Sequence, residues 1–506
     1  MRYTLLFIFI FTTAFAGIGQ NRASDEFRFD VSENPIYLSL SEVVFLAREQ
    51  SPDALIAKHR FRRSYWEFRS FRAGYLPNIR LDATLPNFNR TIDPITQADG
   101  SESYRERTLA RYSTNLSLNQ RIGLTGGEVF LSSGLQRLDN YFSDTTTRQF
   151  LSSPVNIGFR QPIFGYNAYK WDKQIEPIRY EEARRQYLEN TELIAITAVG
   201  HFFNLLMAQI EREIQRKNKA NYDTLFNIAK GRFVLGRIAE NELLQLELNL
   251  LRADAAVEMA DLEYQNMLFT FKSYLRLQTT SPIVLIPPST TEFFTVEVND
   301  ALTQAQTNTS AGLAFDRRLL EAESQISQAR SGSRFDAELY ATFGLTQTSN
   351  RFDEVYKNPL DEERVTLGIV IPILDWGQAK GRIRMAESNL DLVRESIGQE
   401  RLDFEHSIFL KVMQFNMQQN QLMIAAKADT VAQKRFDVTQ KRYMIGSVND
   451  VLELNNAQID NDNAKKGYYN ALKTYWTNYY DLRRLTLFDF RDNRRLSFNP
   501  EDVISR

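Results

Sequence analysis

The chain has 506 residues and a formal net charge of −2, because 61 Lys and Arg nearly balance 63 Asp and Glu. Such a chain lacks the basic surface that nucleic-acid binding requires, so we expect no nucleic-acid partner. It contains no cysteine, which excludes disulfides, thiolate metal sites, a cysteine nucleophile and the lipid-bearing cysteine of a bacterial lipoprotein.

The N-terminus has the pattern of a secretory signal peptide, which we place at residues 1–20. Arg2 supplies a positive charge, Leu5–Phe11 form a short apolar core, and Ala14 and Ala16 form a small-x-small cleavage site. An apolar stretch of about 12 residues is too short to span a bilayer. No later segment was expected to approach ~20 consecutive apolar residues, so the sequence predicts no transmembrane helix. A membrane-embedded form of this chain would therefore be a barrel.

The sequence contains an internal tandem repeat. Two motifs recur 210 residues apart: Gln161–Tyr166 with Ile371–Trp376, and Arg232–Gly236 with Arg442–Gly446. Ser41–Leu81 matches Asn299–Leu339 more weakly, at a separation of 258 residues. Since the two separations differ by 48 residues, the first half carries that much additional chain between Leu81 and Pro162.

Alternation of apolar and polar residues predicts β-strands in both halves. Four such runs lie in the first half, near residues 79–85, 112–118, 129–135 and 155–159, and two in the second, near 339–345 and 365–371. Thr125–Gly127 has the composition of a tight hairpin turn between the middle two runs. The surplus residues are therefore expected to form an additional hairpin, giving six strands per chain. The alternative is that they form an extracellular loop and leave four strands per chain. The strands alone fit a soluble β-sandwich equally well.

Long helices follow the strands in each half. No proline occurs between Pro177 and Pro282 or between Pro372 and Pro500, so uninterrupted helices are permitted. A helix from about Tyr166 to Gly231 would be ~100 Å long. Two stripes with alternating spacings of three and four residues indicate coiled coils. The stripes are Leu243, Leu246, Leu250, Ala253, Val257, Ala260, Tyr264, Met267, Phe271 and Tyr274, and Leu454, Ala457, Asn461, Ala464, Tyr468, Ala471, Tyr475, Asn478, Leu482 and Leu485.

This order of elements resembles the TolC-like outer-membrane efflux family. The most specific features are the junctions at Pro162 and Pro372 and the turn Arg442–Gly446, which leads into Asp450-Val451-Leu452. The family pattern is a Tyr-x-x-Gly turn followed by an Asp-Val-Leu-like helix start. The resemblance implies a mainly α fold with a β-barrel portion, in which a trimeric transmembrane β-barrel continues into a periplasmic α-helical coiled-coil tunnel. Members use two strands per half and 12 per trimer, whereas we expect 18 here.

The repeat divides the chain into five parts. They are the signal peptide (1–20), a first repeat (21–278), an equatorial linker (279–297), a second repeat (298–487) and a C-terminal equatorial tail (488–506). In the first repeat the barrel strands are expected at about 76–162 and the coiled-coil hairpin at about 163–278. In the second they are expected at about 334–373 and 374–487.

The resemblance implies a passive channel of a tripartite efflux or type I secretion system. It would lie in the outer membrane of a Gram-negative bacterium and extend into the periplasm. The implied partners are two further copies in a homotrimer, a periplasmic adaptor (membrane fusion protein), an inner-membrane RND or ABC transporter, and outer membrane lipid. No catalytic motif, cofactor motif or metal-binding histidine spacing is recognisable, so we expect neither enzyme activity nor a cofactor or metal. A structural or adhesive coiled-coil cell-surface protein is the alternative. It explains the heptads but not the matched β segments.

The resemblance also implies a gate at the periplasmic tip. Asp450 and Glu453 match acidic residues that narrow the entrance in the family, and Tyr443 matches a tip tyrosine that ties neighbouring helices together. Asp450 could equally cap the returning helix, and Tyr443 could be ordinary coiled-coil packing.

The two helical turns are candidates for the hairpin tips and for adaptor contact. These candidates are Gly236, Arg237, Gly446 and Ser447. The arginine that usually follows the glycine in the family is replaced by Ser447, whereas Arg237 does follow Gly236.

Overall fold

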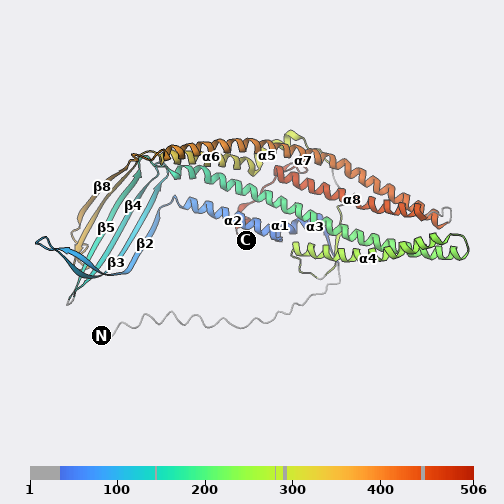
Figure 1. Cartoon of the computed structure of the whole chain (residues 1–506), viewed down its shortest axis with the longest axis horizontal. Coiled ribbons are helices and arrows are strands. Elements are labelled where there is room, and N and C mark those ends of the chain that lie inside the picture. The colour runs from blue at the N-terminus through green and yellow to red at the C-terminus, as the bar shows by residue number, and fades with distance from the viewer. Residues whose placement is uncertain (1–34, 143–144, 280, 289–292, 446–450, 506) are drawn as a thin grey trace, which may run out of the picture.

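The computed structural model describes residues 35–142, 145–279, 281–288, 293–445 and 451–505, which form an elongated molecule (Figure 1). A β-sheet forms one end, and long helices run away from it (Figure 1). The first half contains β1 (Ile36–Ser39), α1 (Leu40–Gln50), α2 (Pro52–Ala73), β2 (Asn78–Thr96), β3 (Glu102–Ile122), β4 (Gly127–Tyr141), β5 (Thr146–Pro162), α3 (Ala168–Val234) and α4 (Glu240–Tyr274). The second contains β6 (Ile283–Ile286), α5 (Val298–Asn308), α6 (Ser310–Ser331), β7 (Asp336–Ser349), β8 (Leu360–Val370), α7 (Gln378–Met444), α8 (Val451–Thr486), β9 (Phe488–Asp489), β10 (Arg494–Arg495) and α9 (Pro500–Ile504).

The helix lengths confirm the tandem repeat. α1 and α5 have 11 residues each, α2 and α6 have 22, α3 and α7 have 67, and α4 and α8 have 35 and 36. At 1.5 Å per residue α3 and α7 are ~100 Å long. α3 packs against α4, and α7 against α8, as two hairpins that extend away from the sheet (Figure 1). Beside the sheet, helices contact in the order α2, α3, α6, α7.

Local signals fix where the first helices begin. The Ser39 side chain accepts a hydrogen bond from the Glu42 backbone N–H, and the Glu42 carboxylate accepts one from the Ser39 backbone, which makes a capping box at α1. Ser51 caps α2 in the same way through the Ala54 N–H, and Pro52 occupies the first helical position. The chain thus passes from α1 into α2, and both helices lead toward the sheet alongside α3 (Figure 1).

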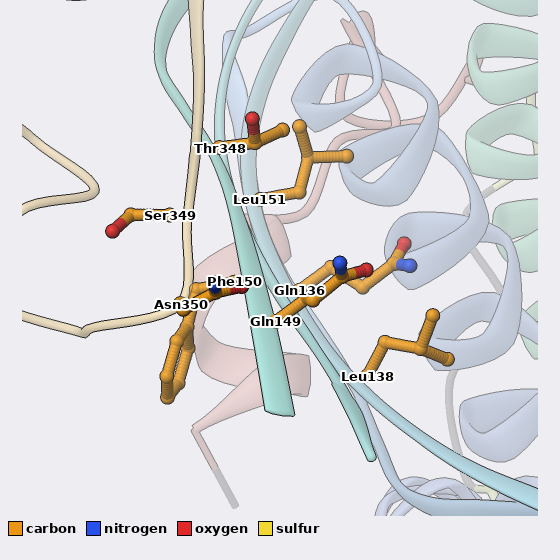
Figure 2. Close-up of a pocket in the computed structure, with 8 residues that line it drawn as sticks. All are labelled: Gln136, Leu138, Gln149, Phe150, Leu151, Thr348, Ser349 and Asn350. Atoms are coloured by element: carbon orange, nitrogen blue, oxygen red, sulfur yellow. The ribbon is translucent and has the colours of Figure 1, made fainter. Parts of the chain in front are cut away.

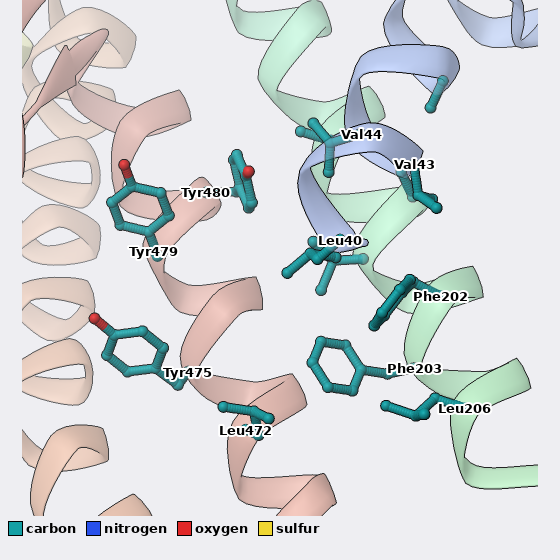
Figure 3. Packing of buried hydrophobic residues seen from close by; sticks show 14 of the residues in the cluster. Leu40, Val43, Val44, Phe202, Phe203, Leu206, Leu472, Tyr475, Tyr479 and Tyr480 are labelled. Atoms are coloured by element: carbon teal, nitrogen blue, oxygen red, sulfur yellow. The ribbon is translucent and has the colours of Figure 1, made fainter. Parts of the chain in front are cut away.

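The main hydrophobic core lies where α1, α3 and α8 meet (Figure 3). Phe202 and Phe203 of α3 are fully buried there, and Tyr475 and Tyr479 of α8 are nearly so. The parallel pair β1–β6 lies beside this core and joins the start of the first repeat to the linker before the second. The core therefore packs together segments from both halves of the chain.

α3 is the helix of the described chain that bears on the expectation of no transmembrane helix. By length and composition α3 contains an 18-residue window apolar enough to cross a membrane, since residues 193–210 carry no Asp, Glu, Lys or Arg. In the described structure 56% of the window is buried within the protein. Ile194, Val199, Phe202 and Leu206 from this stretch belong to the main core. The run is apolar because this part of α3 is surrounded by other helices.

A buried ionic network crosses the same core. Glu192 of α3 pairs with Arg48 of α1 at 2.7 Å and with Arg483 of α8 at 3.1 Å. Arg483 also pairs with Asp489 of β9 at 2.8 Å, and the Tyr479 hydroxyl donates to the same carboxylate at 2.9 Å. The Glu192 and Asp489 side chains are 4% and 1% exposed. Charges this deeply buried are tolerated only when they are paired.

The sheet has six antiparallel strands in the order β2-β3-β4-β5-β7-β8. The expectation of four strands in the first half and two in the second is confirmed. β2 and β8 are the edges of this sheet. β2 and β3 continue past the end of β4, whose last residue Tyr141 lies opposite Thr108, and stay paired up to Thr96 and Glu102. A two-stranded ribbon therefore projects beyond the rest of the sheet (Figure 1).

The register separates an apolar face from a polar face. Leu116 lies opposite Leu81 and Ser133, and Leu118 opposite Ile79 and Leu131, so these side chains share one face. The same face continues across the other strands with Ile157, Phe159, Leu339, Phe343, Val365 and Leu367. Ile79 is 72% exposed and Val365 74% exposed. An exposed apolar face of this extent is typical of a membrane-spanning sheet.

The opposite face is mainly polar. It carries Arg80, Asp82, Thr84, Ser113, Asn115, Ser117, Asn119, Ser132, Gln136, Asn156, Thr342, Thr346, Arg364 and Thr366. Alternation of this kind, with one face toward lipid and one toward water, is the pattern of a membrane pore wall.

We predict that the buried ionic network is required for stability. Replacing Arg483 with Ala leaves Glu192 and Asp489 buried without their shared partner, which costs about 3–5 kcal/mol of unfolding free energy. Chemical denaturation of the detergent-solubilised protein would measure the loss. The control is Arg63→Ala, which breaks an exposed pair with Glu67 worth less than ~1 kcal/mol. Equal effects of the two substitutions would contradict the prediction.

We also predict that adjacent residues on β3 differ in their tolerance of charge. Leu116→Arg places a cation in the middle of the apolar face and should destabilise the membrane-inserted state by about 2–4 kcal/mol. Asn115→Arg, one position away on the polar face, should cost less than about 1 kcal/mol. The amount of folded protein in the membrane fraction and its resistance to urea distinguish the two variants. Similar losses in both would mean that the faces are assigned incorrectly.

Candidate functional site

The polar face of the sheet is the candidate pore wall. At the end of the sheet far from the helices it bears Gln136, Leu138, Gln149, Leu151 and Thr348. Figure 2 shows Gln136, Leu151 and Thr348 on one side of the strands, with the Phe150 ring on the other. This part of the wall mixes uncharged hydrogen-bonding groups with two leucines, and Arg111 lies directly opposite Leu138 on the same face.

Nearer the helices the same face carries an aromatic and charged patch. The Phe130 ring lies across Gly158, where an added Cβ would come 2.0 Å from its Cζ, and it stacks on Tyr340 at 6.0 Å between centroids. The Arg160 guanidinium lies 5.7 Å from the centre of the Tyr340 ring and pairs with Glu338 at 3.6 Å. Glycine is required at position 158 because the ring occupies the space of any side chain. The sequence analysis did not identify this patch, although Phe130 and Tyr340 interrupt otherwise polar positions.

The far ends of the two helical hairpins form the second candidate site. α3 ends at Val234, and Gly236 turns the chain with a φ of +65°, a conformation that favours glycine. The Gly236 N–H donates to the Phe233 carbonyl at 2.8 Å, and the Arg237 N–H to the Arg232 carbonyl at 2.9 Å. Arg237 is exposed at the tip. The two residues therefore lie at the end of the first hairpin, accessible to another protein.

Tyr443 is not exposed within the single chain. It is 2% exposed and packs with Leu225, Leu246 and Leu454 in a small core that joins the two hairpins. The Arg232 guanidinium lies 5.3 Å from the centre of its ring and donates to its backbone carbonyl at 3.2 Å. Burial raises the pKa of the Tyr443 hydroxyl above its ordinary value.

Arg232 is the functional residue that the sequence analysis missed at this tip. It is the last basic residue of α3, yet it reaches across to the end of α7 and donates to the carbonyls of Tyr443 and Met444. Arginine near a helix C-terminus satisfies carbonyls that lack an intrahelical partner. The contact links the first hairpin to the second. Its only sequence signal is the recurrence of arginine at 232 and 442.

Glu453 lies in the first turn of α8 and pairs with Arg442 at 3.8 Å. Both side chains are about half exposed. Asp450, Gly446 and Ser447 lie outside the described residues. Of the predicted tip residues, the structure thus places Tyr443 and Glu453 near the second turn, and Gly236 and Arg237 at the first.

The tips also expose apolar side chains that the sequence analysis did not single out. Val234 and Leu235 are 79% and 70% exposed at the first turn, and Ile445 is 79% exposed at the second. Exposed apolar residues beside a basic side chain are a common composition of protein-binding surfaces. Among the described residues no group of three or more His, Asp or Glu could hold a metal ion.

Residues 301–486 match the family model of the outer membrane efflux protein. Comparison with curated proteins by sequence gave no match.

Several solved structures share the fold over nearly the whole chain. The CmeC outer membrane channel of Campylobacter jejuni is 16% identical, with 92% of this chain and 88% of that chain covered and a TM-score of 0.63. The outer membrane protein VceC of Vibrio cholerae is 12% identical, with coverages of 90% and 97% and a TM-score of 0.61. The open state of the MtrE outer membrane channel of Neisseria gonorrhoeae is 13% identical, with 91% of both chains covered and a TM-score of 0.57.

The family match and the fold agree with the two-faced sheet and the paired coiled-coil hairpins. The second repeat matches the outer membrane efflux protein family, and the chain as a whole has the fold of the outer membrane channels of Gram-negative bacteria.

Proposed function

We propose that three copies of this chain form one continuous duct, the passive exit of a tripartite efflux or type I secretion system. A periplasmic adaptor and an inner-membrane RND or ABC transporter complete the system. The inner-membrane partner supplies the energy, and this chain supplies the path across the periplasm and the outer membrane.

The observation that carries the proposal is the pair of open edges on the sheet. β2 and β8 each leave a row of backbone N–H and C=O groups unpaired within one chain. A membrane offers no water to satisfy them, so a spanning sheet must close. Six strands are too few to enclose a hollow pore, whereas three copies paired β8 to β2 give 18 strands. A closed cyclic assembly satisfies both edges with one repeated contact.

The helices support the same arrangement. Beside the sheet, the row α2-α3-α6-α7 ends in α2 and α7, and no further helix of the row continues it within one chain on the far side of either. α7 exposes large apolar side chains along much of its length, among them Leu392, Leu402, Phe409, Met413 and Met417. A helix of the periplasmic region needs a partner for such a surface. A structural or adhesive coiled coil would also bury it, but such a protein would have no use for a sheet with one polar face.

The proposal is tested by assembly and conductance together. The detergent-solubilised protein should have the mass of three chains and should form discrete channels in planar bilayers. Photoreactive residues at Val234 or Leu235, the exposed apolar tip, should crosslink in cells to a periplasmic adaptor. A monodisperse monomer without channel activity would overturn the proposal. A conducting trimer that captures no adaptor would leave the channel but remove the tripartite partnership.

We further predict that Asp450 and Glu453 set the ion preference of the closed tip. Three copies would gather six carboxylates around a narrow mouth, and like charges repel more strongly there than in bulk water. The double variant Asp450→Ala with Glu453→Ala should have a higher conductance. Its reversal potential in a salt gradient should move toward zero, because the pore loses its preference for cations. The shift should shrink as salt rises, because screening shortens the range of the charges.

The matched control is Glu240→Ala with Glu242→Ala, which removes two carboxylates from the equivalent first turn of α4. This control should retain wild-type selectivity. Wild-type conductance and selectivity in the Asp450 and Glu453 double variant at low salt would assign those residues to helix capping alone.

A further inference from the structure

A compact cluster of three charged residues lies on the apolar face of the sheet, apart from the single acidic residues Asp361 and Glu363 that β8 places on the same face. On β4, Arg137 and Asp139 follow Leu131 and Leu135 at even spacing and therefore point the same way. On β5, Arg148 lies directly opposite Asp139 in the register. Charges on a lipid-facing surface are costly near the bilayer midplane, so a conspicuous cluster there calls for a chemical explanation.

The three side chains form one compact unit. Arg137 donates from Nε to Asp139 Oδ1 at 2.8 Å and from Nη2 to Oδ2, and Arg148 Nε donates to Oδ1 at 3.3 Å. The Asp139 side chain is 4% exposed, whereas Arg137 and Arg148 are 35% and 53% exposed. One buried carboxylate thus pairs with two guanidinium groups, so the cluster has a net charge of one positive unit.

Both arginines keep N–H groups that are available for a ligand. Within the described residues, Arg137 Nη1 and both terminal nitrogens of Arg148 donate no hydrogen bond to the protein. The Arg137 guanidinium also lies 5.0 Å from the centre of the Tyr112 ring, which holds it against the sheet. The carboxylate therefore orients the two arginines and leaves their remaining N–H groups for a ligand.

The cluster lies on the part of the apolar face that is far from the helices. Along β4 the apolar residues Val129, Leu131 and Leu135 come between it and the end of the sheet that joins the helices. Since the helices extend into the periplasm, the far end of the apolar face is the outer one. Aromatic side chains mark that boundary, as expected at a membrane interface. They include Phe88, Tyr112, Tyr141 and Phe150.

Assembly would leave the cluster accessible. β4 and β5 are inner strands of the six, separated from the edges by β3 on one side and β7 on the other. A neighbouring copy joined through β2 or β8 therefore does not cover it.

We propose that Arg137, Asp139 and Arg148 form a binding site for the phosphate groups of a phosphorylated glycolipid in the outer leaflet. The planar guanidinium group of arginine can donate two parallel hydrogen bonds to phosphate oxygens. A phosphate would also balance the one positive charge that Asp139 leaves unbalanced. Asp139 is a positioning residue that fixes the spacing of the two forks. The site concerns lipid binding alone and does not depend on the proposed trimer or on export partners.

The chain contains its own control for this site. The tripeptide Arg-Leu-Asp occurs at 80–82 and again at 137–139. Arg80 pairs with Asp82 at 2.9 Å, as Arg137 does with Asp139, but on the polar face of the same sheet. R80Q/D82N removes an equivalent pair from the wrong face, whereas R137Q/D139N/R148Q removes the proposed site without leaving a buried charge unpaired.

Native mass spectrometry of the detergent-solubilised protein, titrated with bisphosphorylated lipid A, measures the binding. Wild type and R80Q/D82N should bind alike, and the triple variant about tenfold or more weakly. Dephosphorylated lipid A should bind wild type no better than lipid A binds the triple variant. R148Q, which keeps the Arg137–Asp139 pair and so guards against misfolding, should show an intermediate loss.

Unchanged lipid A affinity in the triple variant or in R148Q would overturn the proposal. So would an equal loss in R80Q/D82N. If inorganic phosphate binds wild type as tightly as lipid A does, the residues form a site for a free anion, and the assignment to a lipid fails.

Discussion

The ion pairs of Glu192 hold together segments that are far apart in the sequence. The Glu192 carboxylate, in the middle of α3, pairs with Arg48 near the start of the described chain and with Arg483 near its end. Arg483 also pairs with Asp489. The rest of the molecule extends in two directions from this network. The N-terminal parts of α3 and α7 lie toward the sheet, and their C-terminal parts lie toward the tips (Figure 1). Hydrophobic contacts alone could slide along helices of this length, whereas a buried ion pair has one position. It therefore fixes the register of the helical body.

The sheet performs two tasks with one alternating pattern. Its apolar face meets lipid, and its polar face offers Ser, Asn, Thr and Gln to water. The cluster of charges on the apolar face lies far from the helices, where Asp139 and its two arginines are placed among aromatic rings. The charged residues of the same tripeptide, Arg-Leu-Asp, thus lie on the polar face in β2 and on the apolar face in β4. The strand register, and not the composition, decides which face they occupy.

Sequence periodicity was enough to predict the repeat, the long hairpins and the six strands, because each rests on local alternation or on missing proline. Contacts between distant segments were out of reach. Nothing near Arg232 indicates that it reaches the end of α7, since that contact exists only once two hairpins pack together. Residues 193–210 of α3 are uncharged but are not a continuous apolar run, because His201, Asn204 and Gln209 interrupt them. The lipid-facing position of Asp139 also required the strand register.

The additional hairpin of the first repeat has a geometric consequence. In the proposed trimer the four helices beside each sheet give a ring of 12, with a perimeter of about 110 Å at ~9 Å per helix. Eighteen strands ~4.8 Å apart and tilted ~40° also have a perimeter of about 110 Å, whereas 12 would reach only ~75 Å. Matching circumferences let the four strands that adjoin helices, β2, β5, β7 and β8, continue from them without splaying. The joints are correspondingly short: α2 ends at Ala73 and β2 begins at Asn78, while β5 ends at Pro162 and α3 begins at Ala168. When the helical ring and the barrel have the same circumference and short joints, a twist of the helices is transmitted to the strands. Twisting the tunnel would therefore turn the barrel with it.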